Sequence, residues 1–205
     1  MLLFWPGWVV FRVISLFYGL RFKGRENLPR RGKPLLVVSN HNSRRDPVAI
    51  CLALRRPVHY MAKRENFDPR NGLLEYLMVR LFGAFPVDRE HPGPEVIRTT
   101  EKLLAEGRCV GIFPEGTRHP DTRLHPFEPG AAYIAFRTGA TILPVAVVEE
   151  EGAPYEVRIG KPFRLPPLQG RPREVIPKAN AIIRERVAEL LPPHWETAVE
   201  DGAGS

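Results

Sequence analysis

Short apolar runs that alternate with helical segments are the feature that most constrains the fold of this chain. Continuous apolar runs predict strands over residues 34–40, 57–62, 84–88, 108–114, 141–148 and 155–160, and the segments between and after them predict helices over 46–54, 72–82, 93–106, 129–138 and 175–191. Such alternation is typical of parallel strands joined through helices that cover the faces of a sheet. With 205 residues, the chain has room for one such domain. We therefore predict a single-domain α/β fold with a mainly parallel central sheet flanked by helices.

The first 20 residues have a different character. Residues 1–20 carry one charged side chain, Arg12, and they contain Trp5, Trp8 and Tyr18. We interpret this segment as an amphipathic or hydrophobic membrane-associating helix that lies in the headgroup region, where such aromatic side chains act as anchors. A transmembrane helix is an alternative that would place Arg12 near the bilayer centre at ~2.5–3.5 kcal/mol. A helix packed on its own domain is another. A signal peptide would need a basic start and a small-residue cleavage site, and this segment has neither.

These features divide the chain into three parts. We predict that residues 1–20 form the membrane-associating helix, residues 21–195 the main domain, and residues 196–205 a flexible tail.

An excess of basic residues points to a polyanionic partner. The chain has 30 Lys and Arg against 23 Asp and Glu, a net charge of +7. Such a charge suits nucleic acid, anionic lipid, a phosphorylated substrate or an acidic carrier protein. We find no zinc-ligand spacing and no aromatic RNA-binding segment, so we predict no nucleic-acid partner. An anionic membrane surface is favoured, because a basic cluster directly follows residue 20: Arg21, Lys23, Arg25, Arg30, Arg31 and Lys33.

The two cysteines give no sign of metal or disulfide chemistry. Cys51 and Cys109 lie far apart in apolar segments, and neither belongs to a CxxC pair. We predict no metal site.

A polar loop containing His41 and Asp46 follows the first predicted buried strand. A histidine in a strand-exit loop can act as a general base near neutral pH when a carboxylate fixes its tautomer. Asp46 is the candidate carboxylate, provided that the turn brings the two side chains together. The alternatives are that His41 is an ordinary loop histidine and that Asp46 only caps the helix that Pro47 begins.

A second polar loop follows the predicted strand 108–114, and it points to the same edge of a parallel sheet. Backbone amides around Gly116 and the Arg118 guanidinium could bind a phosphate, and Arg89 could reach the same dianion. Alternatively, both arginines are solvated charges or partners of nearby carboxylates.

These stretches together resemble the glycerolipid acyltransferase family, and within it the bacterial enzymes that make phosphatidic acid. The NHxSxxD block of that family matches Asn40, His41, Ser43 and Asp46. Its second block matches Gly83 to Arg89 loosely, and its FPEGTR block matches Phe113 to Arg118 letter for letter. The fourth block, an apolar strand around VPV, corresponds to Ile142 to Ala146.

The resemblance implies a role for each matching residue. His41 and Asp46 would be the catalytic pair, and Arg89, Glu115, Gly116, Thr117 and Arg118 would bind the phosphorylated acceptor. The implied reaction moves a fatty acyl group from acyl-CoA or acyl-acyl carrier protein to the sn-2 hydroxyl of 1-acyl-glycerol-3-phosphate. It needs no cofactor beyond these co-substrates. From the apolar segment 1–20 and the basic residues behind it, we expect a monotopic location at the cytoplasmic face of the inner membrane.

One departure from the family pattern leaves the acceptor open. Many members of the family carry an aromatic or apolar residue where this chain has Arg44 and Arg45. The acceptor is then alternatively glycerol 3-phosphate or another lysolipid. A non-catalytic lipid-binding membrane module is the alternative from a different class.

Overall fold

A computed structural model describes residues 19–30, 32–73, 76, 79–80, 83–87 and 94–197. The predicted membrane-associating helix therefore lies outside the described residues except for its last two positions. Within the described part of the chain, no helix has both the length and the apolar character needed to cross a bilayer.

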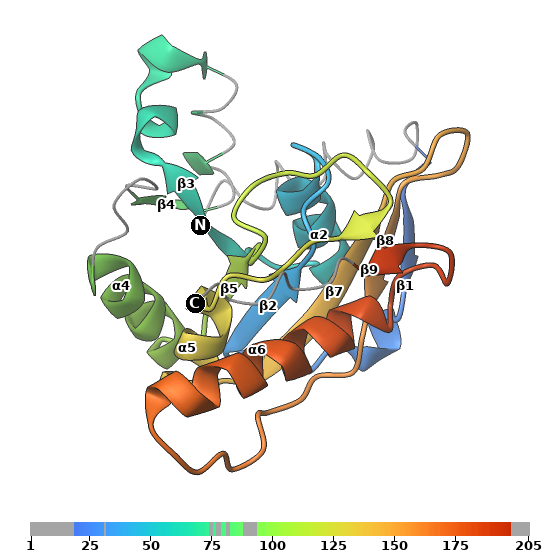
Figure 1. Cartoon of the computed structure of the whole chain (residues 1–205). Helices are drawn as coiled ribbons and strands as arrows, with labels where there is room; N and C mark the ends of the chain where they lie inside the picture. Colours follow the sequence, from blue (N-terminus) through green and yellow to red (C-terminus); the bar gives the residue numbers. More distant parts are fainter. Residues whose placement is uncertain are drawn as a thin grey trace, which may run out of the picture.

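A seven-stranded sheet forms the centre of the domain (Figure 1). Its strands, in spatial order, are β1 (Arg21–Lys23), β8 (Glu156–Ile159), β7 (Ile142–Val148), β2 (Leu35–Ser39), β5 (Cys109–Ile112), β3 (His59–Lys63) and β4 (Phe85–Val87). Strands β7, β2, β5, β3 and β4 run parallel to one another. Strand β8 is antiparallel to β7 and parallel to β1. The predicted mainly parallel sheet is therefore confirmed, with one reversal at β8.

Helices cover both faces of this sheet because alternate side chains of its strands are apolar on both sides. Leu36 and Val38 of β2 pack with residues of α4 (Pro94–Ala105), α5 (Gly130–Thr138) and α6 (Pro172–Ala188). Leu35 and Val37 point to the other face and pack with α2 (Asp46–Leu54). Figure 1 shows α6 crossing one face of the sheet while α2 covers the other.

Shorter elements complete the described fold. Three 3-10 turns span Arg25–Asn27, Arg64–Phe67 and Pro69–Asn71. Strands β6 (Arg123–Leu124) and β9 (Glu196–Thr197) pair in a separate two-stranded sheet. Regular structure thus extends two residues into the segment predicted as a flexible tail, because β9 finds a partner in β6. The rest of the predicted tail, residues 198–205, lies outside the described residues.

The parallel strands β2 and β5 are neighbours in register, so their carboxyl ends meet at one edge of the sheet. Each strand leads directly into a polar loop at this edge, and the loop after β5 arches over it in Figure 1. The fold therefore brings together two segments that lie about 70 residues apart in the sequence.

Candidate active site

Asn40 fixes the start of the loop that follows β2. Its side chain is fully buried, and its amide forms a paired contact with the backbone of Val147 on β7. Asn40 Nδ2 donates to the carbonyl of Val147 at 2.9 Å, and Asn40 Oδ1 accepts from the Val147 N–H at 2.8 Å. These two hydrogen bonds hold the residue before His41 against the central sheet.

His41 and Asp46 are in direct contact. The Nδ1 atom of His41 lies 2.6 Å from Oδ2 of Asp46. Asp46 Oδ2 also accepts from the backbone N–H groups of Asn42, at 2.8 Å, and Ser43, at 2.9 Å. The Asp46 side chain is completely buried. The turn from residue 41 to residue 46 thus places a buried carboxylate against the imidazole.

The alternative that Asp46 only caps a helix is wrong. Helix α2 begins at Asp46 itself, Arg45 occupies the capping position, and no side chain caps the helix. The Asp46 carboxylate instead turns back toward the preceding loop, where it accepts from backbone N–H groups and contacts His41. Its bonds shape the loop and orient the histidine.

The imidazole of His41 is held on a second side by an aromatic ring. The His41 and Phe113 rings stack with centroids 4.0 Å apart and planes 14° apart. Because Oδ2 of Asp46 already accepts two N–H groups, it acts as an acceptor toward His41, which assigns the ring proton to Nδ1. The Nε2 atom then carries the lone pair that a general base needs.

Glu115 ties the two loops together. Its Oε2 accepts from the backbone N–H of His41 at 2.6 Å, and its Oε1 accepts from the backbone N–H of His125 at 3.1 Å. The side chain is buried. Burial raises the pKa of Glu115 to about 7, and the two backbone donors only partly offset that rise. Both carboxylate oxygens are therefore bound within the protein.

The remaining residues of the second loop lie at the surface. Gly116 has a φ of +74° in the turn that its N–H closes with the carbonyl of Phe113, a conformation that favours glycine. Gly116, Thr117 and Arg118 are exposed. The geometry places them next to Glu115 and leaves them accessible to a ligand from solvent.

Sequence reasoning missed the segment after Arg118. The backbone N–H of His119 donates to the carbonyl of His41 at 2.8 Å, and Asn42 Nδ2 donates to the carbonyl of Asp121 at 3.0 Å. The rings of His119 and His125 stack at 3.6 Å. Burial, followed by the nearby His125, lowers the pKa of His119. The available signal was a set of three histidines: His41 in the first loop, and His119 and His125 shortly after the FPEGTR segment.

Arginines also gather near this edge. Arg44 and Arg45 are exposed in the loop that holds His41, and Arg45 lies 3.9 Å from Glu149. Together with Arg118 they give the surface around His41 a positive character. Arg89, the third predicted phosphate ligand, lies outside the described residues.

Neither cysteine belongs to this site. Cys51 and Cys109 are buried, and burial raises the pKa of Cys51 to about 12 and that of Cys109 to about 11. Thiols with such pKa values are not nucleophiles near neutral pH.

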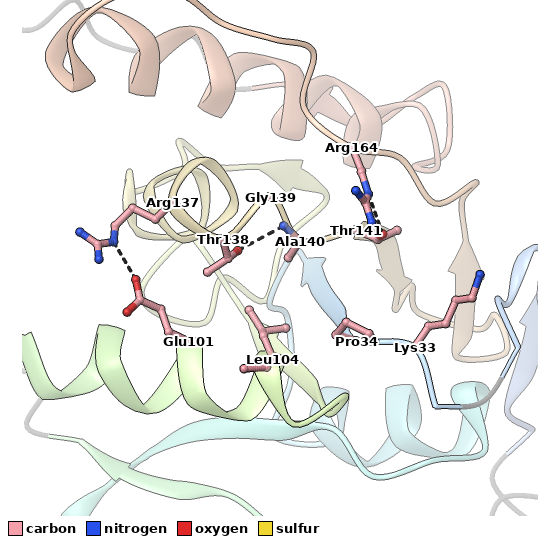
Figure 2. Close-up of a pocket in the computed structure, with 11 residues that line it drawn as sticks. Lys33, Pro34, Glu101, Leu104, Arg137, Thr138, Gly139, Ala140, Thr141 and Arg164 are labelled. Atoms are coloured by element: carbon pink, nitrogen blue, oxygen red, sulfur yellow. Dashed lines mark hydrogen bonds and ion pairs between the residues drawn. The ribbon is translucent and has the colours of Figure 1, made fainter.

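A hollow of about 780 Å³ lies at the opposite edge of the sheet. It is lined by residues that precede β2 and β7, such as Lys33 and Thr141, and by Arg164 from the segment after β8 (Figure 2). Arg137 at its rim is bound to Glu101 at 2.6 Å. Because this hollow lies at the amino ends of the strands, it is separate from the His41 site.

Known proteins share sequence with this chain over most of its length. A family model described as "Acyltransferase" matches residues 19–148. The chain is 33% identical over 179 residues to the 1-acyl-sn-glycerol-3-phosphate acyltransferase of Bacillus subtilis, which covers 87% of this chain and 85% of that protein. It is 36% identical over 146 residues to the human 1-acyl-sn-glycerol-3-phosphate acyltransferase beta, covering 68% of this chain and 50% of the human protein.

The fold also has a counterpart among solved structures. The crystal structure of PlsC, the 1-acyl-sn-glycerophosphate acyltransferase of Thermotoga maritima, matches with a TM-score of 0.63 at 24% identity. The match covers 85% of this chain and 73% of that one. At this identity the likeness supports the α/β fold.

Proposed function

Because the chain belongs to the acyltransferase family, we propose that it transfers a fatty acyl group from acyl-CoA or acyl-acyl carrier protein to the sn-2 hydroxyl of 1-acyl-glycerol-3-phosphate. The product is phosphatidic acid. The observation that carries this proposal is the 2.6 Å contact between His41 Nδ1 and the buried Asp46 carboxylate at the carboxyl edge of the sheet. The names of the relatives supply the acceptor, and the site supplies a base of the kind that the reaction needs.

The chemistry can be followed by atoms. The Nε2 atom of His41 takes the proton of the acceptor hydroxyl while that oxygen attacks the thioester carbonyl carbon. A tetrahedral intermediate forms, the C–S bond breaks, and the thiolate leaves. His41 then returns the proton to the leaving thiolate. Asp46 stabilises the imidazolium between these steps, as the acid does in a Ser-His-Asp triad, with the substrate alcohol in the place of the serine.

This route needs no covalent enzyme intermediate. The attacking oxygen belongs to the acceptor, so neither cysteine has a role, and no cofactor or metal enters a step. Acyl-CoA or acyl-acyl carrier protein serves as a co-substrate.

Arg118 and the exposed backbone around Gly116 and Thr117 are proposed to hold the acceptor phosphate, with Arg89 as a further ligand. A guanidinium can bind two phosphate oxygens at once, which fixes the orientation of the acceptor. The two oxygens of Glu115 are already occupied by backbone N–H groups. We therefore assign Glu115 a supporting role, in which it shapes the acceptor site by holding the His41 loop.

The proposed location is the cytoplasmic face of the inner membrane, with monotopic attachment through residues 1–20. The support is the apolar and aromatic character of those residues and the basic cluster that follows them. The alternative acceptors are glycerol 3-phosphate and other lysolipids. Arg44 and Arg45 beside His41 favour an anionic acceptor in either case.

The proposal is tested by incubating the purified full chain with lysophosphatidic acid and radiolabelled acyl-CoA or acyl-acyl carrier protein. We expect labelled phosphatidic acid with at least one donor, and no product from the His41→Ala variant. Glycerol 3-phosphate and lysophosphatidylcholine serve as competing acceptors. Faster transfer to either of them would identify that compound as the acceptor in place of lysophosphatidic acid. Binding of lysolipid without transfer to any acceptor would favour the non-catalytic module.

A further inference from the structure

We propose that Tyr155 is a positioning residue for the reaction, and that it holds the Asp46 carboxylate in the orientation that His41 requires. This inference rests on the proposed function of His41 as the base. Tyr155 lies beyond Val148, where the family match ends, and it belongs to none of the motifs that identify the site.

The two oxygens of the Asp46 carboxylate have different surroundings. Oδ2 contacts His41 Nδ1 and accepts from the N–H groups of Asn42 and Ser43. Oδ1 accepts from the hydroxyl of Tyr155. Because Oδ1 has no other hydrogen-bond donor among the residues that the structure describes, Tyr155 is its whole support. A carboxylate that is bound at both oxygens cannot rotate about its Cβ–Cγ bond, so Oδ2 stays aimed at the imidazole.

The topology explains how a residue 109 positions away reaches Asp46. Strand β8 runs antiparallel to β7, and Val148 at the end of β7 pairs with Glu156 at the start of β8. The reversal therefore delivers Tyr155, the residue before β8, to the edge where the catalytic loops lie. The N–H of Arg21 donates to the Tyr155 carbonyl at 2.8 Å, which fixes its backbone as well.

The environment of Tyr155 keeps its hydroxyl a donor. Its ring is buried in the same apolar cluster as α2. Burial, together with the charge of Asp46 and the bond to it, raises the pKa of Tyr155 well above its usual range. The hydroxyl therefore retains its proton wherever the enzyme works.

A hydroxyl deletion tests this role directly. Tyr155→Phe keeps the ring and removes the bond to Asp46. With the full chain, lysophosphatidic acid and acyl-CoA, we expect kcat to fall roughly tenfold while the KM of each substrate stays within about twofold, since the hydroxyl supports the base and binds neither substrate. The matched control is Tyr60→Phe, in which a buried tyrosine of the same cluster loses a hydroxyl that bonds to none of the described residues. This control should keep wild-type kcat.

A double-mutant cycle separates positioning from packing. If Tyr155 acts through Asp46, then Tyr155→Phe should cost about tenfold in the wild type and less than about twofold in an Asp46→Asn background. Thermal unfolding of each variant gives the folded fraction, to which kcat is normalised. An equal loss in both backgrounds, or an unchanged kcat in Tyr155→Phe, would overturn the proposal.

A spectroscopic measurement keeps the test independent of the acyl-transfer assay. The proton shared by His41 Nδ1 and Asp46 gives a downfield NMR resonance, identified by its loss in His41→Ala. We expect Tyr155→Phe to shift or broaden this resonance and Tyr60→Phe to leave it unchanged. A resonance that is identical in Tyr155→Phe and wild type would refute the positioning role. Absence of transfer by the wild type would instead refute the proposed function.

Discussion

The backbone N–H of His41 donates to Oε2 of Glu115 at 2.6 Å, so the residue proposed as the base is held by the loop that is proposed to bind the acceptor. The other oxygen of Glu115 holds the N–H of His125 within its own loop. This buried carboxylate therefore joins the two loops, alongside the bonds from His119 to His41 and from Asn42 to Asp121. This relationship gives the glutamate of the FPEGTR segment a structural task that its position in the motif does not reveal.

The raised pKa of Glu115 predicts a stability that depends on pH. Burial raises this pKa from 4.5 to about 7, so between these values the folded protein binds more protons than the unfolded chain. Stability then decreases as pH rises through this window. Relative to Glu115→Gln, which does not titrate, the wild type should lose on the order of 3 kcal/mol of unfolding free energy between pH 4 and pH 8.

Urea unfolding of both proteins at several pH values measures this difference. Glu128→Gln, at an exposed position of the same loop, controls for the loss of one negative charge. A difference between wild type and Glu115→Gln that stays constant from pH 4 to pH 8 would contradict the prediction.

Removal of the imidazole should abolish acyl transfer with little effect on the fold. His41→Ala deletes the proton acceptor, and we expect kcat to fall by at least about 10²-fold. The Asp46 carboxylate keeps its bonds to Asn42, Ser43 and Tyr155, so the loop should remain in place. Circular dichroism checks the fold, and vesicle binding checks that membrane attachment is retained. Turnover near the wild-type level would rule out His41 as the base.

Asp46→Asn should also inactivate the enzyme, for a reason that the structure makes specific. An asparagine cannot offer oxygen at both positions, so its NH₂ group must face either the three donors at Oδ2 or the hydroxyl of Tyr155. We expect kcat, normalised to the folded fraction, to fall by about 10²-fold or more. Asp68→Asn, at a partly exposed carboxylate bound to Arg70, serves as the control. An active Asp46→Asn variant would show that His41 does not require the Asp46 carboxylate.

The elements that continuous apolar runs define could be predicted from sequence. Strand β2 lies within the predicted 34–40, and β7 within 141–148, because both strands are buried along their whole length. Helix α6 begins at Pro172, three residues before its predicted start, since proline suits the first turn of a helix. Strand β1 spans three residues with one partly buried side chain, too short for a period-two pattern to be visible.

The reversal at β8 carried a signal in its spacing. Seven residues separate Val148 from Glu156, and a parallel neighbour needs a crossover of a dozen or more. The pairing of His41 with Asp46 was predictable as a possibility from their spacing. Tyr155 was not predictable, because its bond to Asp46 joins residues that only the arrangement of strands brings together.

Replacement of Arg118 should affect the two substrates differently. Arg118→Lys keeps the charge and removes the two-pronged donor, so the KM for lysophosphatidic acid should rise by about tenfold or more while the KM for the acyl donor changes little. Arg123→Lys, at an exposed position paired with Glu196, tests for a nonspecific effect of the substitution. Equal increases in both KM values would show that Arg118 does not bind the acceptor specifically.

The last prediction concerns attachment to the membrane. The acyl chain of the lysolipid lies in the bilayer, so a domain with its site in a sheet-edge loop must sit on the surface or extract the lipid. The truncation should end at residue 18, because Leu20 packs on the core and Arg21 donates to the Tyr155 carbonyl. Without residues 1–18, we expect loss of binding to anionic vesicles and lower activity on bilayer lysolipid, with unchanged activity on a short-chain soluble acceptor.

Salt distinguishes the apolar and the electrostatic parts of this attachment. High salt should weaken vesicle binding of the full chain only in part, because the apolar contribution of residues 1–20 is not screened. Complete release at high salt would assign attachment to the basic cluster alone. A tag at residue 1 that reacts only from the far side of the membrane would show that the segment crosses the bilayer, and the monotopic arrangement would be wrong.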